Sequence, residues 1–593
     1  GWEDSGEIAA ALRTLGIVHP TGYPLFTLMG RAFSMLPFGD MRVIVQLNLL
    51  GALLTAASVF FFYRFFRLVL SPEGLWPSAR ASGQPSRGGD LSDRLVVGSA
   101  ALTLAFTRVF WAEATTLEVY ALHLVFLSLV SCLFLKALAP STLRREEIGA
   151  GRTWVLFAYV LGLSFTNHMM TVLLAPAFLW LYFKRAGFGR AAWNGIARAG
   201  LPFVAGLSAY LYLPLRASAD PLLNWGDPST PGAFWRHVSA HQFRSFMFSS
   251  WDVARTKFLA TFAALPADFG YAPLLLAVAG LWFLWRRSRG LLLFSSLLFV
   301  ACLFYEINYN FDDPNFRLQT WFAIAIWAAA SLKAFFEMSS VGMRRAGLAL
   351  AVAMPLFPLA LNYAQEDKSQ DYAAEDFARN MLESVEPGAI LYSRQYGTFS
   401  GPASYLQVVE GMRPDVATMD YDLLAKPWYY RYLDRTHPGI LDGLRAEVAL
   451  YAEEYERHDH GAHIPLALHN QQEQLILSIL WKDYPRRPVY ISQATNMRSD
   501  VTPVPEGLAY RLYNTPTAPV SPIRNLLIRP VLPRDSFAVA VLRDYAQAYT
   551  NQGLYRGVVL GDTALGVRFL REALALKPGY APALQWLAKL HAR

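Results

Sequence analysis

Carboxylates and an imidazole gather near the start of the chain, just before a hydrophobic segment long enough to cross a bilayer. Asp4 and Glu7 are three positions apart, Glu3 lies beside them, and His19 follows in a loop punctuated by proline and glycine. If 5–15 is helical, both carboxylates project from one side near its N-terminus, where the helix dipole favours acids. The alternative is a purely structural role, in which Asp4 caps the helix and Glu7 completes a capping box. Because charge at a membrane border is costly unless it binds or reacts with something, we favour a catalytic site.

A second polar group opens an apolar span further along the chain. Glu113 and Glu118 lie between Trp111 and Tyr120, and His123 follows one turn later. Ionisable residues at such a position are functional candidates by default. The alternative is helix capping, with the aromatic residues anchoring the helix at the membrane interface.

Further candidates are scattered through the hydrophobic part of the chain. Asn167 and His168 separate two apolar runs, and a buried, satisfied histidine is about as plausible there as a ligand-binding one. Asp227 lies in the loop 224–230. Guanidinium groups match phosphate oxygens, so Arg244 and Arg317 are the candidates for holding a phosphate. Their alternative role is to snorkel towards lipid headgroups.

The composition indicates a membrane protein. Hydrophobic residues make up 54% of the 593 residues and charged residues only 17%, whereas a soluble protein is closer to a quarter charged. Both cysteines, Cys132 and Cys302, lie inside apolar runs, which argues against a disulfide framework or a thiolate metal site. The net charge of +8 comes from short basic loops between apolar runs, which indicates membrane topology rather than nucleic-acid binding. The start of the chain shows no signal-peptide pattern.

The apolar runs predict about ten spans, several of them shorter than the roughly 20 residues that cross a bilayer upright. They lie near 43–63, 94–110, 118–138, 153–166, 168–183, 198–214, 271–286, 290–306, 319–336 and 346–362.

Basic residues concentrate in every second loop, which the positive-inside rule assigns to the cytoplasm. They include Arg64, Arg67, Arg80, Arg87, Arg94, Arg144, Arg145, Arg152, Lys184, Arg185, Arg190, Arg286, Arg287, Arg289, Lys333, Arg344 and Arg345. The opposite side then receives 1–42, 111–118, 167–168, 215–270, 305–317 and everything after Leu361. All the polar candidates are therefore expected on the non-cytoplasmic face.

The sequence thus divides into four expected regions. Residues 1–42 form a first non-cytoplasmic loop with the acidic motif, and 43–362 form the multi-span membrane region. Residues 363–540 predict a soluble α/β domain, with strands at 389–393, 415–419 and 488–492 and a helix at 402–410. Residues 541–593 predict a tetratricopeptide-like helical cap. The expected fold class is a mainly α, polytopic membrane protein with a soluble α/β region that ends in this cap.

Several common motifs are absent from the sequence. The chain has no Walker loop, no dinucleotide fingerprint, no His-Glu-x-x-His and no Cys/His zinc spacing. A nucleotide-driven pump and a zinc protease are therefore unsupported, and no residue is assigned as a metal ligand.

Several of these motifs together resemble a family of protein O-mannosyltransferase-like membrane enzymes, once filed as a domain of unknown function. Its animal member O-mannosylates IPT domains of receptors in the endoplasmic reticulum. The resemblance rests on Asp4-Ser5-Gly6-Glu7, His19-Pro20-Thr21-Gly22-Tyr23-Pro24, Gln46 to Leu50, Trp111 to Tyr120, Gly162 to His168, Trp225 to Thr230, Tyr405 to Gln407 and Glu410 to Val416.

The resemblance implies a glycosyltransferase of the GT-C type, with a polyprenyl-phosphate sugar donor and an acidic base in the first non-cytoplasmic loop. Asp4 matches the position of that base best. In GT-C enzymes this loop follows a first transmembrane helix, so we expect that the numbering begins just after such a helix. The chain departs from its relatives after the first soluble strand, where it has Ser393-Arg394-Gln395-Tyr396 instead of a Gly-Asp-Asn-type segment.

The expected function is transfer of a sugar, mannose or another hexose, from a polyprenyl phosphate to a hydroxyl on a protein, lipid or glycan. Asp4 would act as the base with Glu7 beside it, and Arg244, Arg317 and His168 would stabilise the leaving phosphate. The remaining donor or acceptor ligands would be His19, Glu113, Glu118, His123, Asn167 and Asp227.

The acidic residues could hold Mg²⁺ or Mn²⁺, although some enzymes of this class work without metal. The alanine-, glycine- and arginine-rich composition suggests a bacterial inner-membrane protein with its C-terminal region outside the cytoplasm. Two alternative functions remain. One is a transporter or flippase for lipid-linked sugars, which needs polar groups near the bilayer midplane. The other is a membrane-anchored scaffold that binds partners through its C-terminal helices.

Overall fold

The structure is a computed structural model of the whole chain. It describes residues 4–71, 74–76, 90–139, 149, 151–311, 313–338, 340–458, 465–494, 498–515, 519–533 and 535–591. Glu3 of the acidic motif and Arg80, Arg87, Arg144 and Arg145 of the basic loops lie outside the described residues.

The chain divides into two compact units that do not follow the order of the sequence. One unit combines Gly1–His19, Ala219–Pro228 and Ser369–Arg593, and we call it the sheet unit. The other combines Pro20–Ser218 and Ser229–Lys368, and we call it the helical unit. The predicted first loop, 1–42, is therefore split between the two units, with its acidic motif in the sheet unit.

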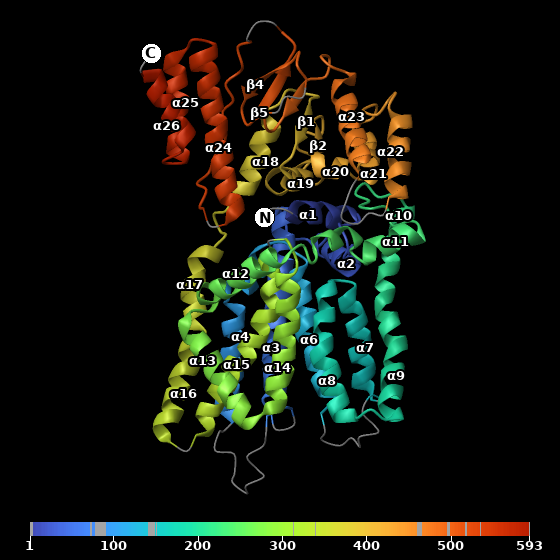
Figure 1. Cartoon of the computed structure of the whole chain (residues 1–593), viewed down its shortest axis with the longest axis vertical. Coiled ribbons are helices and arrows are strands. Elements are labelled where there is room, and N and C mark those ends of the chain that lie inside the picture. Colours follow the sequence, from blue (N-terminus) through green and yellow to red (C-terminus); the bar gives the residue numbers. More distant parts are fainter. Residues whose placement is uncertain are drawn as a thin grey trace. The chain divides into compact units, whose positions relative to one another are not determined.

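The helical unit is a multi-pass membrane structure (Figure 1). Six of its described helical stretches are long and apolar enough to span a membrane. They are α3 (Val43–Val69), α6 (Tyr120–Ala137), α9 to α10 (Arg190–Ser218), α14 (Arg289–Ile307), η6 with α15 (Pro314–Glu337) and α16 with α17 (Val341–Glu366). Two bent pairs raise the number to eight: α4 (Asp90–Ala105) with α5 (Arg108–Thr115) at 68°, and α12 (Trp251–Phe269) with α13 (Tyr271–Arg287) at 115°.

The number of long spans is smaller than the sequence predicted, because two expected spans form shorter helices. The run 153–166 becomes α7 (Arg152–Phe165), an apolar helix of 14 residues. The run 168–183 becomes a 3₁₀ helix, η3 (Met169–Leu174), followed by the 12-residue α8 (Ala175–Ala186). Short helices η4 (Ser208–Leu211), α2 (Pro24–Phe33), α11 (Pro231–Val238), η5 (His241–Phe246) and η6 (Pro314–Arg317) complete this unit.

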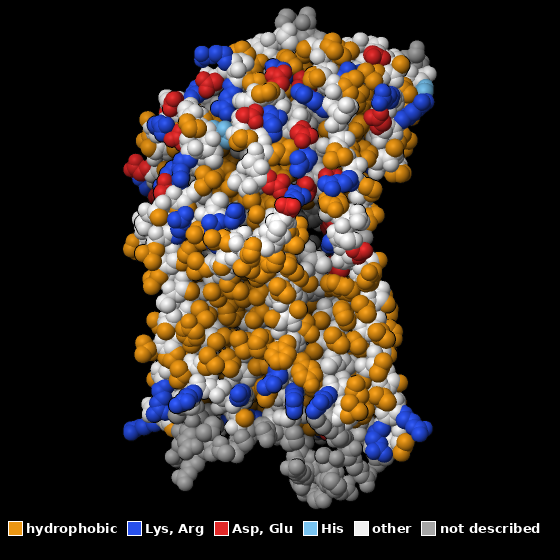
Figure 2. Space-filling model, turned by 180° about the vertical axis from the view of Figure 1, so that it is seen from behind, with side chains coloured by type: hydrophobic (Ala, Val, Ile, Leu, Met, Phe, Trp, Pro, Cys, Tyr) orange, Lys and Arg blue, Asp and Glu red, His pale blue; other side chains and the backbone are white. Residues whose placement is uncertain are grey.

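The surface of the helical unit fits a membrane environment. Figure 2 shows a broad belt of hydrophobic side chains, with Lys and Arg side chains gathered along one end of that belt. Such an arrangement is typical of helices whose basic ends face the cytoplasm. The described part of the chain therefore supports the predicted multi-pass topology.

The sheet unit is built on five strands in the order β2-β1-β3-β5-β4. They are β1 (Ile390–Ser393), β2 (Ala417–Asp420), β3 (Val489–Ile491), β4 (Thr502–Glu506) and β5 (Ala509–Tyr513). β1 pairs in parallel with β2 and β3, and β5 pairs antiparallel with β3 and β4. The three predicted strands correspond to β1, β2 and β3, and the predicted helix at 402–410 is α19 (Gly401–Val408).

Helices surround this sheet and follow it to the end of the described chain (Figure 1). They are α18 (Ala373–Glu383), α20 (Tyr421–Leu424), α21 (Pro427–Thr436), α22 (Arg445–Arg457), α23 (Leu466–Lys482), α24 (Ser536–Leu554), α25 (Thr563–Leu576) and α26 (Ala581–His591). The last three pack on one another around Leu570 and Leu590, as the predicted helical cap requires. Helix α24 begins several residues earlier than the sequence indicated, because Asp535 caps it by accepting a hydrogen bond of 2.8 Å from the Ala538 amide.

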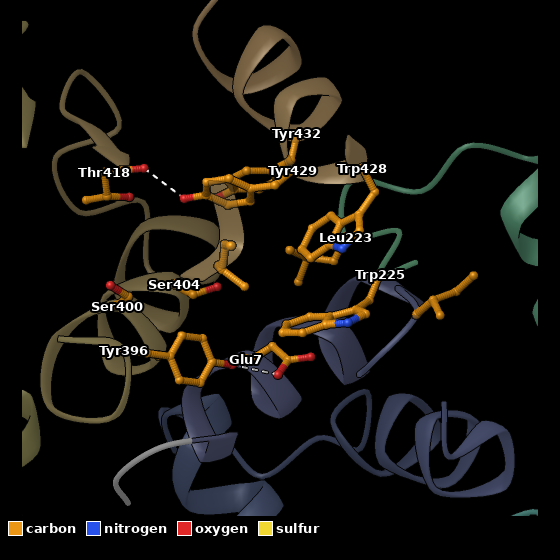
Figure 3. A pocket seen from close by; sticks show the side chains of 13 residues that line it. Glu7, Leu223, Trp225, Tyr396, Ser400, Ser404, Thr418, Trp428, Tyr429 and Tyr432 are labelled. Atoms are coloured by element: carbon orange, nitrogen blue, oxygen red, sulfur yellow. Dashed lines mark hydrogen bonds between the residues drawn. The ribbon is translucent and has the colours of Figure 1, made fainter. Parts of the chain in front are cut away.

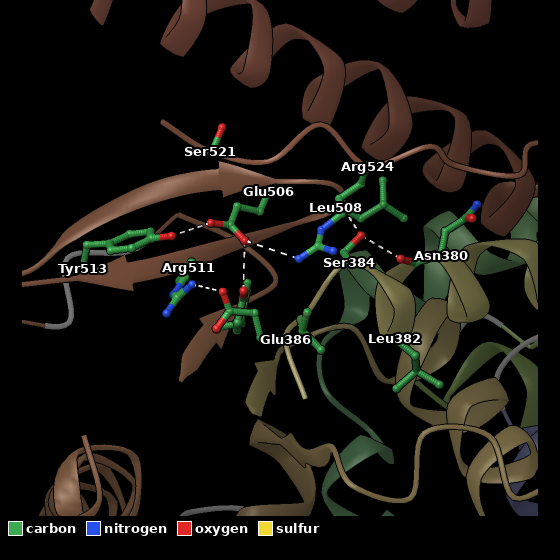
Figure 4. A network of polar contacts seen from close by, with 12 residues as sticks. Asn380, Leu382, Ser384, Glu386, Glu506, Leu508, Arg511, Tyr513, Ser521 and Arg524 are labelled. Carbon is green, nitrogen blue, oxygen red and sulfur yellow. Dashed lines mark hydrogen bonds and ion pairs between the residues drawn. The ribbon is translucent and has the colours of Figure 1, made fainter. Parts of the chain in front are cut away.

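A buried polar network joins the antiparallel strands to the segment that follows them (Figure 4). The Glu506 side chain, which is fully buried, accepts hydrogen bonds from the hydroxyls of Tyr490 (2.9 Å) and Tyr513 (2.7 Å). Arg524 lies 3.9 Å from the same carboxylate. Each of these polar groups would be costly to bury alone. The network therefore holds β3, β4, β5 and the 519–533 segment in fixed positions relative to one another.

Candidate active site

The acidic motif begins a helix of the sheet unit, α1 (Asp4–Thr14), as the sequence predicted. Gly6 explains why this helix can lie directly against α19. A Cβ atom on Gly6 would stand 2.1 Å from the carbonyl oxygen of Gly401, a distance that no side chain tolerates. The glycine between the two carboxylates therefore permits a backbone-to-backbone approach, which brings Glu7 into the interior of the sheet unit.

Glu7 is held by three hydrogen bonds. Its Oε1 accepts from the backbone amide of His19 at 3.0 Å, and its Oε2 lies 3.0 Å from Nδ1 of the same residue. The hydroxyl of Tyr396 donates to Oε2 at 2.9 Å. Because an ionised carboxylate can only accept, Nδ1 is the protonated nitrogen of the His19 ring. Both oxygens of Glu7 are thus occupied, which suits it to hold its neighbours in place.

Asp4 lies one turn before Glu7 and remains more open. Its side chain is 37% exposed, and its Oδ2 is 3.7 Å from Nε2 of His19. Burial of the carboxyl among protein atoms raises the pKa of Asp4, and the nearby Glu7 charge adds to the rise, whereas His19 and the Tyr396 hydroxyl oppose it. Asp4 therefore binds a proton more readily than an ordinary aspartate.

One ligand atom from each of Asp4, Glu7 and His19 lies within 4.8 Å of the others. Two carboxylates and an imidazole are ordinary ligands for a divalent cation such as Mn²⁺. If a cation binds in the sheet unit, these three side chains are the group that would hold it.

A pocket opens beside Glu7, and all of its lining residues belong to the sheet unit (Figure 3). Its space is about 510 Å³, including the part open to solvent. Aromatic side chains dominate the lining, and Glu7 is the only charged residue in it. The lining residues are Glu7, Ile17, Leu223, Trp225, Tyr396, Ser400, Gly401, Ser404, Thr418, Leu423, Trp428, Tyr429 and Tyr432.

Two backbone hydrogen bonds hold the loop 219–228 against the segment that follows α1. The Ile17 amide donates to the Leu223 carbonyl at 2.7 Å, and the Trp225 amide donates to the Ile17 carbonyl at 3.3 Å. The Trp225 ring then meets the His19 ring edge-on, with centroids 5.9 Å apart, and lies 4.9 Å from the Trp428 ring. This attachment places Trp225 between the acidic cluster and the pocket wall.

Asp227, which the sequence suggested as a binding residue, fastens the same loop instead of lining the pocket. Its carboxylate pairs with Arg431 at 2.5 Å and accepts a hydrogen bond of 3.2 Å from the Asn224 side chain. Both contacts of Asp227 therefore hold the loop in place.

Tyr396 is the main site residue that sequence reasoning missed. It begins a π-helical turn, η7 (Tyr396–Ser400), which follows β1. Burial and the charges of Glu7 and Asp4 raise the pKa of Tyr396 well above its ordinary value, so it stays protonated and donates. The available signal was its place just past the carboxyl end of a parallel strand, where α/β folds commonly bind ligands.

The next parallel strand also ends in a polar contact beside the pocket. Ser400 donates to Oδ2 of Asp420 at 2.6 Å, and Asp420 also caps the short helix α20. Burial raises the pKa of Asp420 to about 6. The ends of β1 and β2 therefore supply both the hydroxyl that binds Glu7 and a second protonatable carboxyl.

In the helical unit, the structure brings a second set of predicted residues together. The His168 ring lies 4.9 Å from the Tyr120 ring and 5.3 Å from the His123 ring. The Tyr120 hydroxyl donates to Asp313 at 2.7 Å, and Nε2 of His123 lies 3.0 Å from the Gln319 amide nitrogen. The His168 ring also caps η3, because its Nδ1 accepts a hydrogen bond from the Met170 amide at 3.2 Å. These contacts favour the alternative of a structurally satisfied histidine at position 168.

The remaining candidates of the helical unit have different environments. Asn167 donates to the Val119 carbonyl at 3.1 Å, and Glu113 on α5 is 1% exposed, whereas Glu118 is half-buried. Arg317 is paired with Glu306 at 3.2 Å, so a phosphate would have to share it with a carboxylate. Arg244 is exposed on η5.

The predicted site residues thus fall into two sets. The sheet unit holds Asp4, Glu7, His19 and Asp227, and the helical unit holds Glu113, Glu118, His123, Asn167, His168, Arg244 and Arg317.

Comparison with known proteins identifies related sequences over both units. Residues 4–188 match a domain described as "Protein O-mannosyl-transferase TMEM260 N-terminal domain", and residues 374–462 match "TMEM260-associated domain 2". The resemblance expected from the motifs is confirmed over these residues. The first match includes the acidic helix, and the second includes all of the pocket-lining residues after β1.

Two curated relatives extend this similarity. The chain is 28% identical over 464 residues to the protein O-mannosyl-transferase TMEM260 of Mus musculus, a match that covers 74% of this chain and 62% of that protein. It is 22% identical over 476 residues to the Dictyostelium discoideum protein of the same name, covering 72% of this chain and 55% of that protein. The chain therefore spans less than two thirds of the relatives that it matches. Both relatives are eukaryotic, so they give no support to the bacterial source suggested by composition.

Two solved structures align with most of the chain at low sequence identity. ArnT from Cupriavidus metallidurans bound to undecaprenyl phosphate aligns with a TM-score of 0.47 and 13% identity, covering 87% of this chain and 92% of that one. The Archaeoglobus fulgidus oligosaccharyltransferase in complex with Zn and sulfate aligns with a TM-score of 0.43 and 13% identity, covering 83% of this chain and 64% of that one.

Proposed function

We propose that this chain is an integral-membrane glycosyltransferase of the GT-C type. It moves a sugar, mannose or another hexose, from a polyprenyl-phosphate donor to a hydroxyl of a protein acceptor. The relatives named protein O-mannosyl-transferase support this reaction, and the matched domains include both the acidic helix and the region after β1. The observation that carries the proposal is the open carboxylate of Asp4, held beside an aromatic pocket by the Glu7, His19 and Tyr396 contacts.

In this mechanism Asp4 is the general base. It takes the proton from the acceptor hydroxyl as that oxygen attacks the anomeric carbon and the polyprenyl phosphate departs. Asp4 suits this role better than Glu7, because Glu7 already accepts three hydrogen bonds whereas Asp4 keeps an exposed edge. A positioned base contributes roughly 10²–10⁴-fold to the rate.

Glu7, His19 and Tyr396 act as positioning residues in this proposal. His19 donates Nδ1–H to Oε2 of Glu7 and turns Nε2 towards Asp4, and the Tyr396 hydroxyl donates to the same oxygen of Glu7. The charge that develops on the departing phosphate needs cationic partners, which is commonly the larger contribution to catalysis. Arg244 is our first candidate for that role because it is exposed, and Arg317 is second because Glu306 already holds it.

We place the reaction on the non-cytoplasmic side of the membrane. The support is the alternation of basic loops, which assigns the acidic motif and the residues after Leu361 to the face opposite the basic one. A transporter of lipid-linked sugars is less well supported. His123 is the fourth residue of the 18-residue helix α6, so this buried polar residue lies near a helix end and not at its middle.

The test is to reconstitute the purified full chain in nanodiscs with radiolabelled polyprenyl-phosphate mannose or glucose and a protein rich in Ser and Thr. The proposal expects label on the protein, in O-glycosidic linkage, from one of these donors. Movement of intact labelled lipid between leaflets without transfer would instead indicate a flippase.

A further inference from the structure

The aromatic pocket carries little charge. Glu7 is the only carboxylate among its thirteen lining residues, and neither lysine nor arginine occurs among them. A phosphate group in the pocket would meet a carboxylate with no lining cation to compensate, and charges of like sign repel strongly away from bulk water. The pocket is therefore unsuited to the phosphate end of a lipid-linked donor.

Two hydroxyl groups in the lining are not engaged with the protein. Tyr432 is 9% exposed, and neither its hydroxyl nor that of Ser404 makes a hydrogen bond with another described residue. In Figure 3, Ser404 lies between Tyr396 and Tyr429, on the same side of the pocket as Tyr432. The Trp428 indole N–H, which also lines the pocket, is buried and has no hydrogen-bond partner among the described residues. A buried donor without a partner is costly, and a bound ligand with a carbonyl group would supply one.

The walls suit an extended polypeptide. The Tyr429 and Tyr432 rings are stacked 5.4 Å apart at 17°, and Trp225 and Trp428 face the other side of the space. Rigid aromatic side chains provide large contact areas at low entropic cost, and extended peptides commonly dock in aromatic-lined grooves.

We propose that this pocket is the acceptor subsite, which binds an extended polypeptide segment without acidic residues and presents its Ser or Thr hydroxyl towards the Asp4–Glu7 cluster. The inference rests on the proposed function and extends it, because it assigns the acceptor side to the sheet unit. It makes Ser404 and Tyr432 recognition residues. It also predicts that acidic residues next to the acceptor hydroxyl are rejected by Glu7.

The direct test measures peptide binding without any donor. The full chain in nanodiscs is titrated with a fluorescein-labelled peptide, Gly-Ala-Val-Thr-Val-Ala-Gly, and with a version in which both Val residues are Glu. We expect the neutral peptide to bind at least tenfold more tightly than the acidic one. Equal affinity for the two peptides would overturn the charge argument.

Variants then locate the binding. Ser404→Phe fills the pocket and should abolish peptide binding while leaving the affinity for undecaprenyl phosphate unchanged. The milder substitutions Ser404→Ala and Tyr432→Phe should each lower the affinity for the peptide about three- to tenfold, the range expected for the loss of one hydrogen bond. Ser478→Phe on α23, where the serine is exposed and lies outside the lining, is the matched control and should change neither affinity. Loss of undecaprenyl phosphate binding with peptide binding intact would assign the pocket to the donor.

Steady-state transfer separates this inference from the proposed function. Ser404→Ala should raise the KM for the acceptor several-fold, with the KM for the donor and kcat nearly unchanged. A rise in the donor KM alone would contradict the acceptor assignment. If no donor supports transfer while peptide binding still depends on Ser404 and Tyr432, the peptide subsite stands and the proposed reaction fails.

Discussion

The Tyr396 hydroxyl donates a hydrogen bond of 2.9 Å to Glu7, although 389 positions separate the two residues in the chain. This contact ties the acidic helix α1 to the turn after β1, within one compact unit. The carboxylates at the start of the chain therefore depend for their orientation on Tyr396, about two thirds of the way along the 593 residues.

Tyr396→Phe should move the pH dependence of transfer. Asp4 must be ionised to act as a base, so kcat/KM rises with pH through the Asp4 pKa, which lies above that of an ordinary aspartate. The Tyr396 hydroxyl stabilises the ionised carboxylate and lowers that pKa. Its removal should shift the acid limb of kcat/KM to higher pH, which pH–rate profiles of the two proteins will measure.

The control for that experiment is Tyr451→Phe. Tyr451 is fully buried and donates to the Ala425 carbonyl at 3.0 Å, away from the acidic cluster. It should lower stability without moving the acid limb. A shift of the limb to lower pH in Tyr396→Phe would contradict the role given to this hydroxyl.

Gly6→Ala should disrupt the packing of α1 on α19. The added Cβ would lie 2.1 Å from the Gly401 carbonyl oxygen, and overpacking of this kind typically costs about 1–3 kcal/mol. We expect a lower thermal-unfolding midpoint together with a loss of transfer that exceeds the loss of folded protein, because Asp4 and Glu7 move with the helix.

Gly200→Ala provides the comparison, since Gly200 lies in helix α9 with nothing within 4 Å of an added Cβ. It should be neutral or slightly stabilising, because alanine favours helices. If Gly6→Ala were equally harmless, the close contact of α1 with α19 would not be needed for activity.

Asp420→Asn should change how stability depends on pH. The folded protein holds the Asp420 proton up to about pH 6, whereas the unfolded chain releases it near the ordinary value of 3.8. Ionising this buried carboxyl therefore costs stability progressively as the pH rises from about 4 to 6, and the full cost is present above 6. Asparagine does not ionise and escapes this cost. The stability of the variant minus that of the parent should therefore be larger at pH 7 than at pH 4. Thermal-unfolding midpoints across this range test the sign, and an opposite trend would show that the ionised form is the better partner for Ser400.

Glu506→Ala should destabilise the sheet unit but should not change the transfer reaction itself. The change leaves Tyr490, Tyr513 and Arg524 without their shared acceptor (Figure 4), at a cost of roughly 3 kcal/mol for one partner of a buried network. Glu453→Ala removes an exposed pair with Arg457 and should cost less than about 1 kcal/mol. The folded fraction of each variant should retain its transfer rate. A selective loss of kcat in Glu506→Ala would indicate that this network serves the site directly.

The sequence predicts local elements better than it predicts the partners that complete the site. The helix at Asp4, the strands at 389–393 and 488–492 and the terminal helices all follow from periodicity and punctuation, which are local signals. The apolar runs 153–166 and 168–183 were harder to interpret, because they have the composition of membrane spans without the length of one.

Tyr396 and Arg431 show what a single sequence leaves out. Nothing local to Tyr396 indicates that it meets Glu7, and nothing local to Asp227 indicates that Arg431 will pair with it. Both contacts arise because the fold joins three distant segments into the sheet unit. The residue types in the site were therefore predictable, whereas their division into a base and a set of holding residues required the structure.

The most direct measurement is the transfer rate of Asp4→Asn beside that of Glu7→Gln, with labelled polyprenyl-phosphate mannose and a bound acceptor peptide in nanodiscs. We expect Asp4→Asn to lose at least about a hundredfold in transfer rate with peptide affinity and folding intact, because only the base is removed. Glu7→Gln should lower the transfer rate less than Asp4→Asn does, and it should also lower the affinity for the acceptor peptide. Full activity in Asp4→Asn would contradict the assignment of the base.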